Sequence, residues 1–193
     1  PPLGTGLRGE LTGGGSPPLP GPAGGRRAGA GPRRIARYKS GKYTIERPLQ
    51  LGAALAGGHP LAEPLCRYGE PLGEAFQLRD DVQGAFGDTA LTGKPVGDDL
   101  REGKPTMLLA VAHEHATGPQ QAVLDQVGDP ALGTDAVADV QEVLVATGAL
   151  AAVEREIDAL AAQAVASLAT LPVEAEVGTA LTELAAFVVA RTG

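Results

Sequence analysis

Cysteine, tryptophan and aromatic residues in general are scarce in this sequence. Its 193 residues include one cysteine, Cys66, and no tryptophan, and aromatic residues make up 3% of the chain. A single cysteine excludes a disulfide within the chain and favours a reducing compartment. The apolar fraction of 43% comes in large part from alanine and leucine, which favour helices, rather than from the residues that favour strands. We therefore expect an all-α protein.

Long apolar runs are also missing. No run reaches the roughly 18 residues that a membrane-spanning helix needs. The longest candidate, residues 143–171, is interrupted by the charged side chains of residues 154–156 and by Asp158. The N-terminus shows no apolar segment of the signal-peptide kind. These absences predict a soluble, cytoplasmic protein that is not an integral membrane protein.

Basic charge is confined to the start of the chain. Residues 1–37 hold six arginines and one acid, Glu10, so their net charge is +5, and the other 156 residues carry −12 of the overall −7. Nucleic-acid binding needs a basic face, so we expect no nucleic-acid partner for the folded part. Glycine and proline occupy 18 of the first 34 positions, too many for a packed core. We predict two parts: a disordered or foreign segment, residues 1–36, and a domain, residues 37–193.

Helical patterns fill most of the second part. Predicted helices span residues 49–57, 61–86, 107–116, 135–147, 150–170 and 174–191, and the last two repeat apolar residues at spacings of three and four. A polar, glycine-containing loop is predicted over residues 87–105. No alternating strand pattern occurs. The predicted architecture is an antiparallel helical bundle.

Two adjacent aspartates stand in the segment FQLRDDVQGAFGD, residues 76–88. On a helix, Gln77, Asp80, Asp81, Gly84 and Asp88 share one broad face. Two neighbouring carboxylates repel each other unless a cation neutralises them, and hard oxygen ligands of this kind suit Mg²⁺. For an isolated Asp-Asp pair the ordinary interpretation is a solvated helix face, so the neighbouring residues decide between the two.

Lysines in glycine-rich turns favour the metal interpretation. Lys94 and Lys104 follow the aspartates, and the segment KSGK, residues 39–42, precedes them. Carboxylates that hold Mg²⁺ and lysines that meet phosphate oxygens together make a diphosphate site. By contrast, the glycine pattern of residues 4–9, GTGLRG, lacks the flanking strand and helix of a nucleotide-binding turn. His113 and His115 lie two positions apart and face different sides of a helix, and Cys66 is expected to be a small residue that is buried or half-buried.

Four segments resemble the C-terminal half of the polyprenyl synthetase family, the trans-isoprenyl diphosphate synthases, and look most like bacterial geranylgeranyl diphosphate synthases. They are YKSGKYTIERPLQLGAALAG, YGEPLGEAFQLRDDVQGAFGD, TGKPVGDDLREGKPTMLLAVA and LTELAAFVVAR. The resemblance covers roughly residues 37–193. It implies the helical isoprenoid synthase fold, incomplete at its N-terminal side. It also implies a prenyltransferase that condenses isopentenyl diphosphate with an allylic diphosphate, using Mg²⁺ held by two facing aspartate-rich motifs.

The resemblance assigns roles to particular positions. Lys39, Ser40, Lys94 and Lys104 match residues that contact the allylic diphosphate, and Gln77 matches the glutamine beside the reacting centre. Asp80 and Asp81 match the metal-binding start of the second aspartate-rich motif. Asp99 matches a position that supports the lysine loop, whereas Lys42 matches no functional position.

Two departures from the family pattern bear on activity. Gly84 stands where the second motif, DDxxD, usually has its last aspartate, although Asp88 follows one turn later. The first aspartate-rich motif and the basic residues that hold isopentenyl diphosphate are absent. We therefore expect a truncated chain that is inactive alone and exposes apolar surface. The alternative is a non-catalytic regulatory subunit of a full-length homologue, so a homodimer or a heterodimer is expected.

Overall fold

The computed structural model describes residues 43–87 and 95–190, and every regular element in these two ranges is helical. This confirms the all-α prediction. The elements, in chain order, are α2 (Arg47–Leu55), η2 (His59–Leu61), α3 (Ala62–Phe86), α5 (Asp98–Arg101), α6 (Met107–His115), α7 (Gly118–Leu124), α8 (Thr134–Ala146), α9 (Ala149–Ser167), η3 (Leu168–Thr170) and α10 (Ala175–Ala190).

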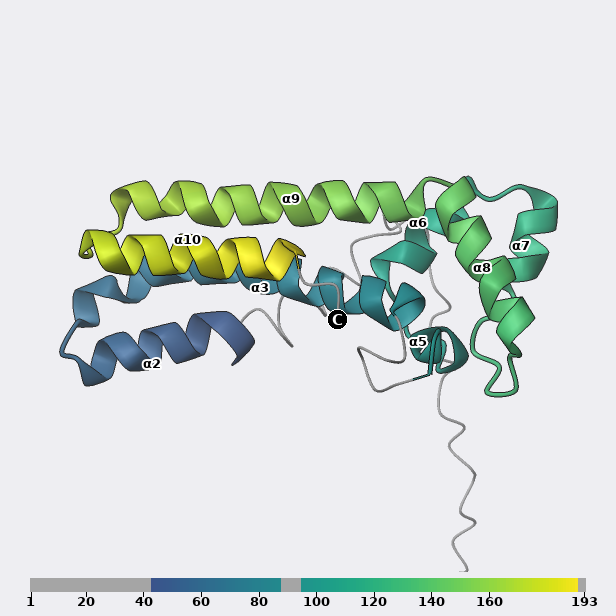
Figure 1. Ribbon diagram of the computed structural model, residues 1–193, viewed down its shortest axis with the longest axis horizontal. Helices are drawn as coiled ribbons and strands as arrows, with labels where there is room; N and C mark the ends of the chain where they lie inside the picture. Colours follow the sequence, from purple (N-terminus) through teal and green to yellow (C-terminus); the bar gives the residue numbers. More distant parts are fainter. Residues whose placement is uncertain (1–42, 88–94, 191–193) are drawn as a thin grey trace, which may run out of the picture.

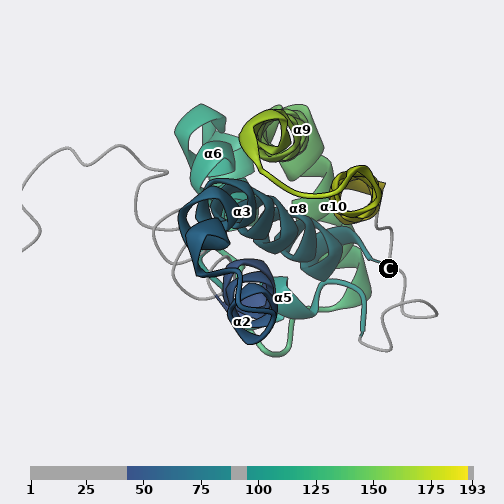
Figure 2. The same ribbon diagram turned by 90° about the vertical axis from the view of Figure 1, so that its left-hand side faces the viewer.

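Helices α3 and α9 form the central pair of the bundle. They run side by side along its length, and α10 packs against both of them (Figure 1). Helix α2 lies against α3 on the side away from α9, as the view along the helix axes shows (Figure 2). The shorter helices α5, α6, α7 and α8 gather at one end of the bundle, near the C-terminal end of α3.

The core is built from the facing stripes of the central pair. Tyr68, Leu72 and Leu78 of α3 and Val153 and Ile157 of α9 are all fully buried or within 1% of it. Each large apolar side chain buried in this way contributes about 1.5–3 kcal/mol. These buried residues therefore form one continuous apolar face on each helix.

Most of the predicted helices are confirmed, within one or two residues at each end. The predicted loop over residues 87–105 was wrong in one part, because Asp98–Arg101 forms the short helix α5. Helix α7 was also missed, since its seven residues show no clear apolar period. Its start carried a usable signal: Gln120 Oε1 accepts a hydrogen bond from Thr117 N at 2.9 Å, as in a capping box.

Within the described ranges, no single helix is both long and apolar enough to cross a membrane. One pair, α8 followed by α9 and η3, meets the length and composition criteria together but is bent by 64°.

Candidate active site

The C-terminal half of α3 presents Gln77, Asp80 and Asp81. Gln77 and Asp81 are one helical turn apart, and Gln77 Nε2 donates a hydrogen bond to Asp81 Oδ1 at 2.9 Å. Asp81 is buried, with 8% of its surface exposed, whereas Asp80 keeps 47% of its side chain accessible. The two adjacent carboxylates therefore differ: Asp81 belongs to the interior of the bundle, and Asp80 borders its surface.

Lys104 joins these aspartates from the segment after α5. Its Nζ lies 3.0 Å from Asp81 Oδ1 and 4.0 Å from Asp80 Oδ2. It also donates a hydrogen bond of 2.7 Å to Asp99 Oδ2. The fold thus brings together three carboxylates and one ammonium group that lie up to 24 positions apart, from residue 80 to residue 104. One positive charge against three negative charges leaves two negative charges at this point of the surface.

The electrostatic environment acts on both members of the closest pair. Burial raises the pKa of the Asp81 carboxyl, and the charge and hydrogen bond of Lys104 oppose that rise. Burial alone would lower the pKa of Lys104, but the hydrogen bond to Asp99 and the charge of Asp81 outweigh it, so the pKa lies above its ordinary value. Lys104 therefore stays charged, and Asp81 is the member whose ionisation depends on a nearby cation.

Gly84 makes room for Asp99. A Cβ placed on Gly84 would lie 2.1 Å from Asp99 Oδ2 and 2.3 Å from Asp99 Cγ, which no real side chain tolerates. The carboxylate of Asp99 therefore occupies the space beside α3 that a side chain at position 84 would fill. The sequence showed a glycine where the second motif usually ends in aspartate, and only the structure shows that another carboxylate lies there.

A bidentate ion pair fixes this half of α3 to α9. Arg79 Nη1 and Nη2 each donate a hydrogen bond of 2.7 Å to one carboxylate oxygen of Glu154. The Arg79 side chain is 12% exposed, and its Nε has no hydrogen-bond partner. Gln141 Nε2 of α8 also donates to the backbone oxygen of Ala85 at 2.6 Å. These contacts hold the helix that carries the aspartates in one position.

The remaining candidates from the sequence are either outside the described residues or exposed histidines. Lys39, Ser40 and Lys94, together with Lys42 and Asp88, fall outside the described residues, and their predicted roles stay predictions. His113 and His115 are both exposed and make separate contacts: His113 Nδ1 lies 3.0 Å from Gln121 Oε1, and His115 Nδ1 lies 2.9 Å from the Val111 oxygen.

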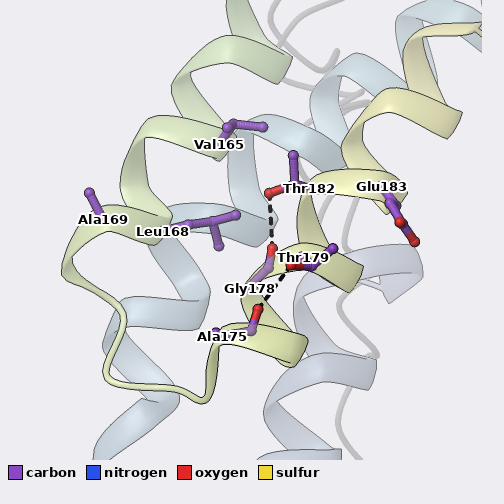
Figure 3. A pocket seen from close by; sticks show the side chains of 8 residues that line it. All are labelled: Val165, Leu168, Ala169, Ala175, Gly178, Thr179, Thr182 and Glu183. Carbon is purple, nitrogen blue, oxygen red and sulfur yellow. Dashed lines mark hydrogen bonds between the residues drawn. The ribbon is translucent and has the colours of Figure 1, made fainter.

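A groove of about 400 Å³ lies between the end of α9 and the start of α10 (Figure 3). Two of its polar side chains bond within α10: Thr179 Oγ1 donates to the Ala175 oxygen and Thr182 Oγ1 to the Gly178 oxygen. Among the described residues predicted for the diphosphate site, none of Gln77, Asp80, Asp81 and Lys104 lines it. The groove therefore has no visible link to that chemistry.

One further cluster of potential metal ligands was not predicted from the sequence. Glu46 lies beside Cys66 and Glu70, with the three ligand atoms within 4.8 Å of one another. Cys66 and Glu70 are one turn apart on α3, which a search for helical i, i+4 pairs would find. Glu46 lies 20 positions upstream of Cys66, and only the packing of the chain brings it to them.

The fold and the site define an all-helical bundle in which α3, α5 and the segment after α5 bring three aspartates and a lysine together. Residues 32–146 match the polyprenyl synthetase family, more than half of the chain. The chain therefore belongs to the polyprenyl synthetase family.

Relatives and solved structures agree with this assignment. The chain is 37% identical over 117 residues to geranylfarnesyl diphosphate synthase of Aeropyrum pernix. The matched residues are 60% of this chain and 36% of that protein. The chain is 36% identical over 136 residues to octaprenyl diphosphate synthase of Escherichia coli strain K12, covering 70% and 42%. These relatives differ in the length of their products.

A crystal structure of geranylgeranyl pyrophosphate synthase from Corynebacterium glutamicum, complexed with isoprenyl diphosphate and magnesium, has a similar fold. Its TM-score is 0.79 at 40% identity, over 82% of this chain and 46% of that chain. A polyprenyl synthase from Caulobacter crescentus has a TM-score of 0.75 at 32% identity, over 84% and 49%. The fold is thus that of isoprenyl diphosphate synthases, and this chain spans less than half the length of the relatives and structures named here.

Proposed function

We propose that this chain carries the second aspartate-rich motif of a trans-isoprenyl diphosphate synthase, which forms one side of its metal and diphosphate site. The observation that supports it most directly is the cluster of Asp80, Asp81 and Asp99 around Lys104. Its two excess negative charges and its hard oxygen atoms fit Mg²⁺, which binds through one or two carboxylates and substrate phosphates. Mg²⁺ bound there would stabilise the negative charge that develops on the departing diphosphate.

The reaction proposed is the condensation of isopentenyl diphosphate with an allylic diphosphate. Asp80 and Asp81 would hold the metal, with the more exposed Asp80 at the solvent side and Asp81 set by Gln77 and Lys104. Lys104, together with Lys39, Ser40 and Lys94, would meet the allylic diphosphate as point charges and a hydrogen-bond donor. Gln77 would stand beside the reacting carbon.

We further propose that these 193 residues do not turn over substrate by themselves. Asp80 is the first aspartate of the sequence, so the facing aspartate-rich motif is not among them. The alternative is a non-catalytic subunit that pairs with a full-length homologue. The presence of only one of the two aspartate-rich motifs favours this alternative as much as it favours an inactive part of an enzyme. In both cases the proposed domain is residues 37–193, the proposed setting is the cytoplasm, and a dimer is expected.

Metal-dependent binding of an allylic diphosphate tests the site separately from turnover. Farnesyl thiodiphosphate, which resists ionisation, is titrated calorimetrically into the full chain with Mg²⁺ and again with a chelator. We expect binding that requires Mg²⁺ and that falls by about tenfold or more in D81N. The matched control is D98N, a neighbouring carboxylate that is not paired with Lys104. Binding that is equal with and without Mg²⁺, or equal in D81N and D98N, would contradict the proposed site.

Turnover distinguishes the two forms of the proposal. The chain is incubated with Mg²⁺, isopentenyl diphosphate and allylic diphosphates of increasing length, alone and after co-expression with a full-length synthase. We expect no prenyl diphosphate from the chain alone. A changed rate or product length in the co-expressed mixture supports the subunit alternative, and robust turnover by the chain alone overturns the proposed inactivity.

A further inference from the structure

A second cluster of potential ligands lies at the other end of α3. Cys66 and Glu70 are one turn apart on this helix, and Glu46 precedes α2. One ligand atom from each, two carboxylate oxygens and the sulfur, lie within 4.8 Å of one another. Cys66 is 14 positions from Asp80 along the same helix, a separation of about 21 Å. The cluster is therefore distinct from the site proposed for diphosphate.

Glu46 is the unusual member of the cluster. Only 3% of its surface is exposed, and its Oε2 is fully buried without a hydrogen-bond partner. A buried carboxylate oxygen with no partner loses its hydration without replacement, a cost that proteins usually avoid. The position of Glu46 is nevertheless enforced by packing. A Cβ on Gly69 of α3 would lie 2.8 Å from Glu46 Cα, so the glycine lets the two backbones approach.

The surroundings of Cys66 add to the negative character of the cluster. Burial, the charges of Glu46 and Glu70, and a hydrogen bond with the Glu46 side chain all raise the pKa of the thiol. In the absence of a metal, the raised pKa therefore favours the protonated thiol. Glu46 Oε2 nevertheless has no hydrogen-bond partner, so the thiol does not satisfy the whole Glu46 carboxylate.

We propose that Glu46, Cys66 and Glu70 form a binding site for a borderline divalent cation of the Zn²⁺ class. Zn²⁺ accepts both thiolate and carboxylate ligands and is commonly four-coordinate, so three protein ligands leave one position for water. Binding forms one metal–sulfur bond and releases the thiol proton to solvent, and the cation compensates the buried charge of Glu46. Mg²⁺ is not expected here, because it prefers oxygen ligands in octahedral geometry. The two clusters on α3 would then select different metals.

Co²⁺ is the probe for this site, because a thiolate ligand gives it an intense charge-transfer absorption in the near ultraviolet. Cys66 is the only cysteine, so that band has a single possible source in the chain. The full chain, reduced with a phosphine and freed of metal, is titrated with CoCl₂. We expect one equivalent to produce the band and ZnCl₂ to abolish it by displacement. Absence of the band in the native chain overturns the proposal.

Substitutions identify the ligands. C66S should remove the band, and E46Q and E70Q should each weaken Co²⁺ binding by about tenfold. The matched control is E63Q. Glu63 lies on the same helix, but its side chain is 76% exposed and paired with Arg67, so this variant should bind Co²⁺ as the native chain does. Circular dichroism melts of the metal-free variants confirm folding first. If E46Q and E70Q both bind Co²⁺ as tightly as E63Q, the thiol acts without the carboxylates and the three-residue site is wrong.

Zn²⁺ also gives a readout that does not depend on absorption. A cation that binds only the folded chain raises its melting temperature. We expect ZnCl₂ to raise the melting temperature of the native chain and of D80N, and to leave that of C66S unchanged. An equal rise in C66S would place the Zn²⁺ elsewhere and contradict the proposal.

Discussion

The buried carboxylates at the two halves of α3 differ in how far the protein pairs them. In the C-terminal half, Asp81 faces Lys104 at 3.0 Å, and the neighbouring Arg79 pairs with Glu154 through two bonds of 2.7 Å. In the N-terminal half, Glu46 packs against the helix with one oxygen that has no partner. Two acidic clusters thus lie along the same helix. Lys104 neutralises part of the charge of the first, and the second leaves Glu46 Oε2 without a hydrogen-bond partner. The first is the site proposed for a metal and diphosphate together, and the second is the site proposed for a metal alone.

Removing Lys104 should make the first cluster resemble the second. K104M leaves Asp81 and Asp99 without their shared cation, and we expect it to lower the free energy of unfolding by about 3 kcal/mol at neutral pH. Urea denaturation measures this loss. The control is R67M, which removes an exposed pair of 3.8 Å with Glu63 and should cost about 0.5 kcal/mol or less. Equal losses in the two variants would show that Lys104 does not neutralise a buried charge.

Tyr68 shows how a neutral polar group is held in the N-terminal half. It is fully buried, its hydroxyl donates a 2.6 Å hydrogen bond to the Leu181 oxygen, and burial raises its pKa to about 12. Between the unfolded value of about 10 and this folded value, the unfolded chain loses the proton first. The free energy of unfolding should therefore fall as pH rises from 10 to 12, by up to about 2.7 kcal/mol.

Denaturation at successive pH values measures that fall, and Y68F is the control because it has no phenol to titrate. The variant should lose about 1 kcal/mol at neutral pH, for the missing hydrogen bond, and should show a smaller fall between pH 10 and 12. A fall of the same size in Y68F would assign the effect to other groups.

Gly84 tests the close approach that assembles the first cluster. G84A should lower the free energy of unfolding by about 2 kcal/mol, because its Cβ displaces the Asp99 carboxylate from α3 and from Lys104. In a D99A background most of the clash is gone, and alanine is favoured over glycine in a helix by about 0.5–1 kcal/mol. The same substitution should then be neutral or slightly stabilising. The double-mutant cycle over these four proteins measures the coupling, and additive effects would contradict it.

Glu46 gives the smallest expected effect, and its sign is opposite. Without metal, E46Q removes a buried negative charge beside Glu70, so we expect it to raise the free energy of unfolding by about 1 kcal/mol. Urea denaturation in the presence of a chelator measures this gain. E63Q, at an exposed position, should change stability by less than about 0.5 kcal/mol. A loss of stability in E46Q would mean that the Glu46 carboxylate is satisfied in the folded chain.

Much of this molecule could be predicted from local sequence. Apolar residues at spacings of three and four located α9 and α10, because a helix must bury one face against its neighbours. Helical spacing also placed Gln77, Asp80 and Asp81 on one face, and the hydrogen bond from Gln77 to Asp81 follows from their separation of one turn. Helices α5 and α7 were missed because four and seven residues are too few to show a period.

The sequence by itself determined the helical class, the family and the pairing of two aspartates on one helix, since each depends on residues close together in the chain. Only the tertiary structure decided that Asp99 fills the space beside Gly84, that Lys104 lies between Asp81 and Asp99, and that Glu46 meets Cys66 and Glu70. Such contacts join residues that are distant in sequence, and they depend on how closely two backbones pack. That closeness is set by the whole bundle, and no local pattern of residues specifies it.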